Sequence, residues 1–157
     1  MRIEYDLKFR DYLLFNGLHQ LLSPAVQFFY LFCVLAVFVT EPEGTPLAVR
    51  VLAAILFYIA VWTIQLLFNV VYLYSSKNRT ILTQHTITVQ DEWLLDETTF
   101  SKSQHYWAGI HKVVRRPGFV AVYMNAHAAH IIPSRAFPSD EHRSRFVSEI
   151  KIKLATA

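Results

Sequence analysis

The feature that most constrains this chain is a long apolar run from Leu47 to Tyr74, whose one charged residue, Arg50, lies near its start. A helix needs about 20 predominantly apolar residues to span a bilayer. Tyr72 and Tyr74 close the run at the level that aromatic side chains favour, and Lys77 and Arg79 follow directly. The run therefore predicts a membrane-spanning helix over residues 47–74.

Another apolar run, Pro24 to Thr40, lies earlier in the chain. Its length is at the short end of the range that can span a bilayer. We expect it to form a span of about residues 23–40, so that residues 23–76 make a transmembrane helical hairpin. The turn between the runs carries Glu41 and Glu43 and no base, whereas Lys and Arg lie on both flanks. By the positive-inside rule, both termini are expected in the cytoplasm of a multi-pass inner-membrane protein.

One side of the second span carries polar and amphipathic residues at helical spacing: Trp62, Gln65, Asn69 and Tyr72. Amides in hydrocarbon need partners, so this side is expected to contact either the first helix or a second copy of the chain. The second case would make the protein a homo-oligomer. A polar pathway for ions is the weaker alternative, because the set contains no ionisable residue of the kind that marks such pathways.

Residues 1–22 combine two periodicities. Alternation from Ile3 to Phe9 predicts a short half-buried strand, and the spacing from Asp11 onward predicts a helix with an apolar side. The helix could lie on the membrane as an interfacial segment, or it could pack on the hairpin or on the C-terminal domain. The sequence alone leaves both interpretations open.

Residues 77–157 change to short alternating segments and predict a small cytoplasmic domain. Its expected strands are Thr80–Gln90, Trp93–Thr99, Ser101–Tyr106, His111–Arg116, Phe119–Asn125 and His127–Ile132. A final helix is predicted after Ser139, which suits an N-cap; acids fill its first turn and lysines its last. The predicted fold is α+β: a transmembrane hairpin, then an antiparallel β domain closed by a helix, similar to a pleckstrin-homology (PH) domain.

Two segments of this domain carry a resemblance to a known family. Trp107 to Val113 follows the pattern W-x-x-I-x-K-V, and Ile131 to Phe137 follows I-I-P-x-R-x-F before the last helix. With two preceding spans, the chain resembles the YcxB-like family of small bacterial membrane proteins. The resemblance implies a helical hairpin that carries a cytoplasmic PH-like domain, and it implies no catalytic residues.

Composition excludes several classes of site. Cys33 is the single cysteine, so the chain has no disulfide or cysteine metal site of its own, and its four glycines are too scattered for a phosphate-binding loop. The net charge of +3 includes no basic run longer than Arg115-Arg116, which disfavours nucleic acid. The histidines, including His127 and His130, show no ligand spacing. We expect no metal and no cofactor, and histidines that are solvated or hydrogen-bonded.

Catalytic patterns are also missing from the sequence, so we expect no enzyme. The acid pairs Asp91-Glu92 and Asp96-Glu97 are interpreted as solvated turn and edge residues. Candidate lipid- or partner-binding residues are the bases expected at one end of the sheet: Lys112, Arg115, Arg116 and Arg135. Such bases attract anionic lipid. The alternative, which the sequence alone favours, is a solvated face that keeps the domain soluble.

Two functional hypotheses follow. In the first, a non-enzymatic inner-membrane protein uses its PH-like domain to bind a protein or anionic-lipid partner at the membrane surface. In the second, an immunity-type membrane protein neutralises a toxin that acts on the same membrane. Small size and the absence of a catalytic set permit both.

Overall fold

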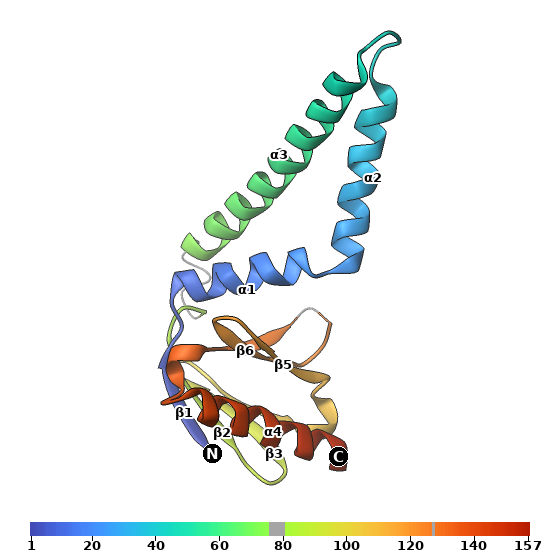
Figure 1. The fold of residues 1–157 in the computed structure, drawn as a ribbon. Helices are drawn as coiled ribbons and strands as arrows, with labels where there is room; N and C mark the ends of the chain where they lie inside the picture. The colour runs from blue at the N-terminus through green and yellow to red at the C-terminus, as the bar shows by residue number, and fades with distance from the viewer. Residues whose placement is uncertain (76–80, 127) are drawn as a thin grey trace. The chain divides into compact units, whose positions relative to one another are not determined.

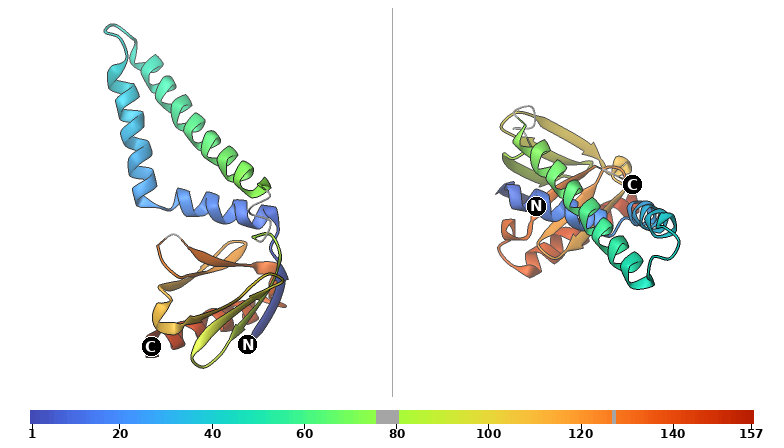
Figure 2. Two further views of the ribbon diagram at one scale, coloured as in Figure 1. Left: turned by 180° about the vertical axis from the view of Figure 1, so that it is seen from behind. Right: turned by 90° about the horizontal axis from the view of Figure 1, so that it is seen from above.

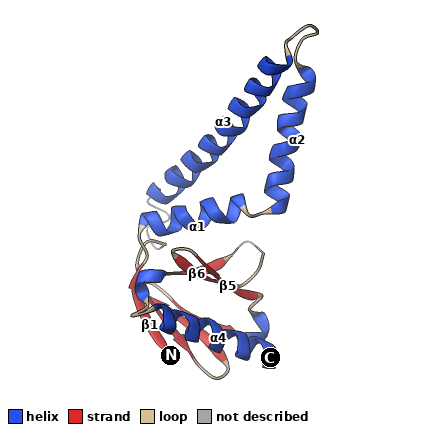
Figure 3. Cartoon of the chain, in the orientation of Figure 1, coloured by secondary structure: helices blue, strands red, loops and turns tan. Residues whose placement is uncertain are grey.

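The computed structural model describes residues 1–75, 81–126 and 128–157 of the chain. Lys77, Arg79, Thr80 and His127, which the sequence analysis used, lie outside these residues. The chain divides into two compact units, one of Met1–Phe15 with Ser76–Ala157 and one of Asn16–Ser75. The fold class is α+β, as predicted, with its helices and two antiparallel sheets seen in Figure 3.

The unit of Asn16–Ser75 is a helical hairpin of α2 (Pro24–Thr40) and α3 (Leu47–Tyr74). The two helices lie close together at the turn and are further apart at their other ends (Figure 1). Among the described residues, only α3 is long and apolar enough to cross a membrane alone, and its apolar window is almost wholly exposed. α2 meets the same test only together with α1 (Phe9–Leu21), from which it bends by 67°. By length and composition, the described part of the chain thus has one helix that fits a span, or two if the bent pair counts as one.

The other unit contains two antiparallel sheets and a helix, α4 (Asp140–Thr156), in an arrangement consistent with a PH-like domain (Figure 2). One sheet has the order β1-β2-β3-β4 and the other β5-β6-β7. The strands are β1 (Arg2–Asp6), β2 (Gln84–Val89), β3 (Trp93–Thr98), β4 (Lys102–Tyr106), β5 (Lys112–Arg116), β6 (Phe119–Tyr123) and β7 (Ala129–Pro133). The predicted order of strands is confirmed.

β1 comes from the start of the chain and pairs with β2, so that Ile3 lies opposite Ile87. The sequence analysis set residues 1–22 apart as a separate segment, whereas Met1–Phe15 clusters with the C-terminal domain. The physical reason is strand pairing: β2 would otherwise be an open sheet edge, and the alternating residues of β1 cover it. Ile3 and Tyr5 face the core and are buried.

The first half of α1 packs on the sheet of β5, β6 and β7. The Phe15 ring meets Phe119 edge-on at 5.6 Å and lies 6.1 Å from the Tyr123 ring. Gly118, with φ of +88°, makes the β5–β6 turn, and a Cβ there would lie 2.6 Å from a Leu14 methyl. Of the two interpretations of this helix, residues 9–15 thus follow the one in which it packs on the C-terminal domain.

The core is built by the inward faces of both sheets and by α4. Ser139 caps this helix as predicted, and its hydroxyl accepts a hydrogen bond from the His142 amide at 3.2 Å. The predicted apolar stripe supplies the buried side chains Phe146, Val147 and Ile150. All five residues of β6 are buried, which means that both faces of that strand are covered. The fully buried side chains include Ile87, Leu94, Val120, Val122, Ile132, Phe146 and Ile150.

Candidate functional site

The four bases named from the sequence have different surroundings. Lys112 and Arg116 are exposed and project from the same face of β5, because side chains two and four residues apart share a face. The Lys112 ammonium lies 5.1 Å from the Tyr123 ring centroid. Across residues 1–75, 81–126 and 128–157, no carboxylate pairs with Lys112 or Arg116. These two bases therefore keep their charge available on the surface.

Arg115 projects from the opposite face of β5 and holds α4 in place. Its guanidinium donates to both carboxylate oxygens of Asp140, at 2.8 and 2.6 Å, and to the Ser144 hydroxyl at 2.8 Å. These contacts lower the pKa of the Asp140 carboxyl. Arg115 thus has a structural partner within its own domain.

Arg135 is also engaged, here by α1. Its guanidinium donates to both oxygens of the buried Asp11 carboxylate and, at 2.7 Å, to the Asp6 carbonyl. Burial raises the pKa of Asp11, but the hydrogen bonds from Arg135 and the Lys8 amide, with the charge of Arg135, bring it below its ordinary value. Arg135 therefore joins the start of α1 to the short 3-10 turn Ser134–Ala136.

The helix-contact residues predicted in α3 are only partly brought to α2. The Trp62 ring meets the Tyr30 ring of α2 edge-on at 6.2 Å. The Asn69 amide instead donates to the Gln65 carbonyl of its own helix at 3.0 Å, and Tyr72 is half-exposed. The sequence set omitted the polar contact that does join the helices, in which the Tyr58 hydroxyl donates to the Gln27 amide oxygen at 2.9 Å.

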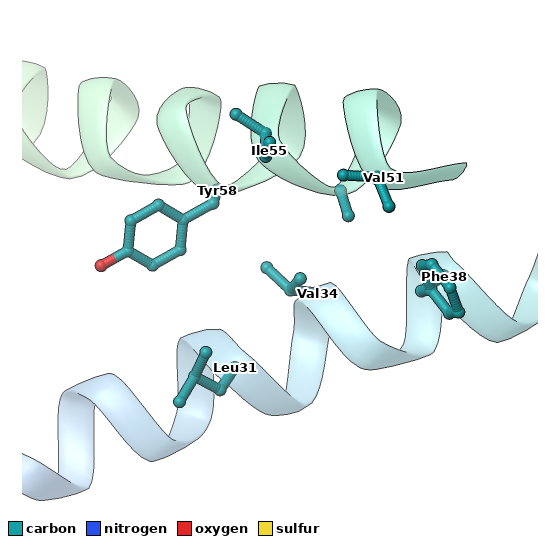
Figure 4. Close-up of a pocket in the computed structure, with 7 residues that line it drawn as sticks. Leu31, Val34, Phe38, Val51, Ile55 and Tyr58 are labelled. Atoms are coloured by element: carbon teal, nitrogen blue, oxygen red, sulfur yellow. The ribbon is translucent and has the colours of Figure 1, made fainter. Parts of the chain in front are cut away.

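A groove with a volume of about 300 Å³ lies between α2 and α3 towards their turn. Figure 4 shows side chains of both helices directed towards it. Its lining is apolar apart from the Tyr58 hydroxyl and consists of Leu31, Val34, Phe38, Val51, Ala54, Ile55 and Tyr58. Such a lining offers van der Waals contact and no chemistry, which suits helix packing or acyl chains.

A buried polar cluster joins the two sheets inside the domain. Asp96 of β3 is 6% exposed, and its two oxygens lie 3.1 Å from Nδ1 of His85 and 3.0 Å from Nδ1 of His130. Nε2 of His130 in turn lies 2.9 Å from Nε2 of His105 on β4. The Tyr5 ring stacks on His85 with 5.4 Å between centroids. We call Tyr5, His85, Asp96, His105 and His130 the intersheet cluster.

Electrostatics separates the pKa values within this cluster. Burial raises the pKa of Asp96, but the hydrogen bonds and charges of His130 and His85 outweigh burial and hold it well below the ordinary range. Burial and then His130 lower the pKa of His105, and Asp96 opposes them. Burial and Asp96 raise the pKa of Tyr5. The electrostatics therefore favours an ionised Asp96 close to a neutral His105 and a neutral Tyr5. No group in the described part of the chain has three or more side chains arranged to hold a metal ion.

The sequence analysis interpreted Asp96 as a solvated edge residue, and that interpretation is wrong. Asp96 lies two residues after the fully buried Leu94, and His85 lies two residues before the fully buried Ile87. Side chains two apart on a strand share a face, so strand periodicity predicts that Asp96 and His85 both point inward. This signal was present in the sequence. The convergence of His105 and His130 was not, because it depends on how the two sheets face one another.

These features define a class: a small α+β domain joined to exposed apolar helices, which fits a membrane protein. Residues 89–150 match the model of the YcxB-like protein family. The match confirms the resemblance to the YcxB-like family that was drawn from the sequence. Comparison with curated proteins and with solved structures gives no match.

The two sequence segments that carry the resemblance have structural roles. Trp107 is 4% exposed, and its indole nitrogen donates to the Asp91 carbonyl at 2.9 Å. In the second segment Ile132 and Phe137 are buried, and the Ser134 amide donates to the Gly118 carbonyl at 2.8 Å. Both segments therefore contribute to the packing and hydrogen bonding that hold the domain together.

Proposed function

We propose that this chain is a non-enzymatic bacterial inner-membrane protein whose α+β domain contacts anionic lipid headgroups at the cytoplasmic surface. In this proposal α2 and α3 both span the membrane, and both termini lie in the cytoplasm. We assign no catalytic residue. The observation that carries the proposal is a pair of exposed bases, Lys112 and Arg116, on the sheet face that α1 partly covers. No carboxylate among the described residues pairs with either base.

Chain connectivity tethers the domain to the hairpin through two connections. α1 ends at Leu21 and α2 begins at Pro24, so a spanning α2 keeps the end of α1 at the surface. The Arg135–Asp11 ion pair ties the start of the same helix to the domain. The return connection from Tyr74 enters β2 at Gln84, opposite Asp6 at the end of β1. Both connections thus reach the domain at the same end of one sheet.

Tethering makes weak binding sufficient. Each base near an anionic surface contributes about 1 kcal/mol, so Lys112 and Arg116 together contribute about 2 kcal/mol, a roughly thirtyfold shift towards the bound orientation. A covalent tether supplies an effective concentration near the millimolar range, which removes the need for a deep pocket. Arg115 and Arg135 are left out of the proposed contact because Asp140 and Asp11 engage them.

The test compares the full chain in nanodiscs of phosphatidylcholine with nanodiscs that also contain phosphatidylglycerol. We expect amide exchange of residues 112–119 to slow in the anionic discs, and a Lys112→Ala/Arg116→Ala variant to lose this difference. The matched control is Arg145→Ala/Lys151→Ala, which removes equal charge from exposed positions on α4. Equal exchange in both lipids, or equal loss in the control, would contradict the proposal.

A further inference from the structure

The intersheet cluster is the one described group of titratable side chains that bridges the two sheets, and the proposed membrane contact does not use it. We infer that it is a pH-sensitive latch, which holds β4 against β7 when His105 is neutral and releases them when His105 and His130 are both protonated. The strands concerned are the last in each sheet order, so their contact closes one side of the domain.

Hydrogen-bond chemistry fixes the protons of the closed latch. An ionised carboxylate only accepts, so His85 and His130 must each present Nδ1–H to Asp96. Neutral His130 then has a lone pair on Nε2, which accepts the Nε2–H of His105 across 2.9 Å. With three neutral rings and one carboxylate, each of these contacts has one donor and one acceptor.

A first proton is tolerated. If His130 takes it, its Nε2 becomes a donor, and His105 can change tautomer so that its own Nε2 accepts. The cation then lies beside the Asp96 carboxylate, and the pair carries no net charge. A second proton on His105 has no such solution, because two N–H groups would point at each other across 2.9 Å. The lowered pKa of His105 agrees with this order of protonation.

The neighbouring strands place several polar and titratable side chains around His105. β1 supplies Tyr5, whose raised pKa keeps its hydroxyl neutral, and β2 and β3 supply His85 and Asp96. Ser103 pairs with Asp96 across β3 and β4, and β7 supplies His130. Among these described groups Asp96 is the one anion, so it compensates a single added positive charge and not two.

The sign of the effect follows from the direction of the His105 pKa. A histidine whose folded pKa lies below its ordinary 6.5 binds fewer protons when folded than when unfolded. Its stabilisation is therefore complete above that ordinary value and is lost as the pH falls through the lowered one. The latch therefore opens when the pH falls and stays closed when the pH rises.

The test is hydrogen–deuterium exchange of the full chain in nanodiscs at about pH 7.5 and about pH 5, corrected for intrinsic exchange. We expect amides of β4 and β7 to exchange about tenfold faster at the lower pH in the wild type. The His105→Gln variant should show no such increase, because an amide can donate to neutral His130 or accept from its cation. The control His111→Gln changes an exposed histidine outside the cluster and should behave as wild type.

A second measurement keeps the inference falsifiable if His105→Gln folds poorly. Nitrogen-15 shifts of the wild-type imidazoles should show His105 titrating below the ordinary value of 6.5, with β4 amide shifts moving at that same midpoint. Three results would each contradict the latch: equal protection of β4 at both pH values, an equal increase in exchange in His105→Gln, or titration of His105 at or above its ordinary value of 6.5.

Discussion

Arg135 and Asp11 lie 124 residues apart in the chain and form a two-pronged ion pair, with one contact of 2.6 Å. The Asp11 side chain is 9% exposed and that of Arg135 is 33% exposed, so the carboxylate is the more deeply buried partner. The arginine belongs to the family-like segment before the last helix, and the aspartate lies in the first turn of α1. This pair makes the N-terminal segment part of the C-terminal domain.

Loss of the arginine should destabilise the domain. We expect Arg135→Ala to lower the free energy of unfolding by about 2 to 3 kcal/mol, because it leaves a buried carboxylate without its partner. Urea unfolding followed by tryptophan fluorescence would measure the change. Arg116→Ala is the matched control and should stay within about 0.5 kcal/mol of wild type, as surface substitutions do. Equal effects of the two variants would show that the ion pair contributes nothing specific.

Acid should weaken the folded domain through Asp11 and Asp96. The pKa of each lies below the ordinary 3.8 when folded, so the unfolded chain binds more protons in that range. The stabilisation is complete above about pH 4 and is lost as the pH falls through the lowered values. Asp11→Asn should therefore be less stable than wild type at neutral pH and should lose less stability on acidification. Parallel pH profiles of unfolding free energy for the two proteins would refute this.

The centre of α3 should reject charge if it lies in lipid. Ile59 is 53% exposed, and an arginine at the centre of a spanning helix costs about 2.5 to 3.5 kcal/mol of insertion free energy. We expect Ile59→Arg to reduce the carbonate-resistant membrane fraction strongly. Phe100→Arg, at a 64% exposed position between β3 and β4, should leave that fraction unchanged. Full membrane retention of Ile59→Arg would argue against a span.

The hydroxyl of Tyr58 should contribute modestly to packing of α2 on α3. Tyr58→Phe removes the 2.9 Å hydrogen bond to Gln27, and such interhelical bonds average about 0.6 kcal/mol. Titration with a denaturing detergent would report the change. Thr63→Val is the control, since the Thr63 hydroxyl bonds only the Ile59 carbonyl of its own helix in the contacts described. A larger loss of stability in Thr63→Val than in Tyr58→Phe would contradict a role for the Tyr58–Gln27 hydrogen bond in joining the two helices.

Local signals made much of this fold predictable. Hydropathy predicted both ends of α3. The N-cap Ser139, with acids in the first turn and lysines in the last, predicted the start of α4 at Asp140. Alternation placed the strands from Trp93 onward to within about two residues of their observed ends, because neighbouring strands joined by short turns pair locally.

Non-local contacts account for what the sequence did not predict. The pairing of β1 with β2 joins segments separated by the whole hairpin, and no local pattern specifies that partner. The same holds for Arg135 with Asp11 and for His105 with His130, which meet only after the sheets have packed. All four candidate bases are exposed, but Asp140 engages Arg115 and Asp11 engages Arg135. Within the described residues, Lys112 and Arg116 are the two without a carboxylate partner, and the lipid hypothesis depends on them.

Two spans with both termini in the cytoplasm are the central claim of this account, and cysteine accessibility tests it most directly. In a Cys33→Ser background, Glu43→Cys would mark the turn between α2 and α3, and Ala157→Cys would mark the C-terminus. A membrane-impermeant maleimide applied to intact spheroplasts should label the first variant, and should label the second only after lysis. Labelling of the Ala157→Cys variant in intact cells, or protection of the Glu43→Cys variant, would contradict the claim.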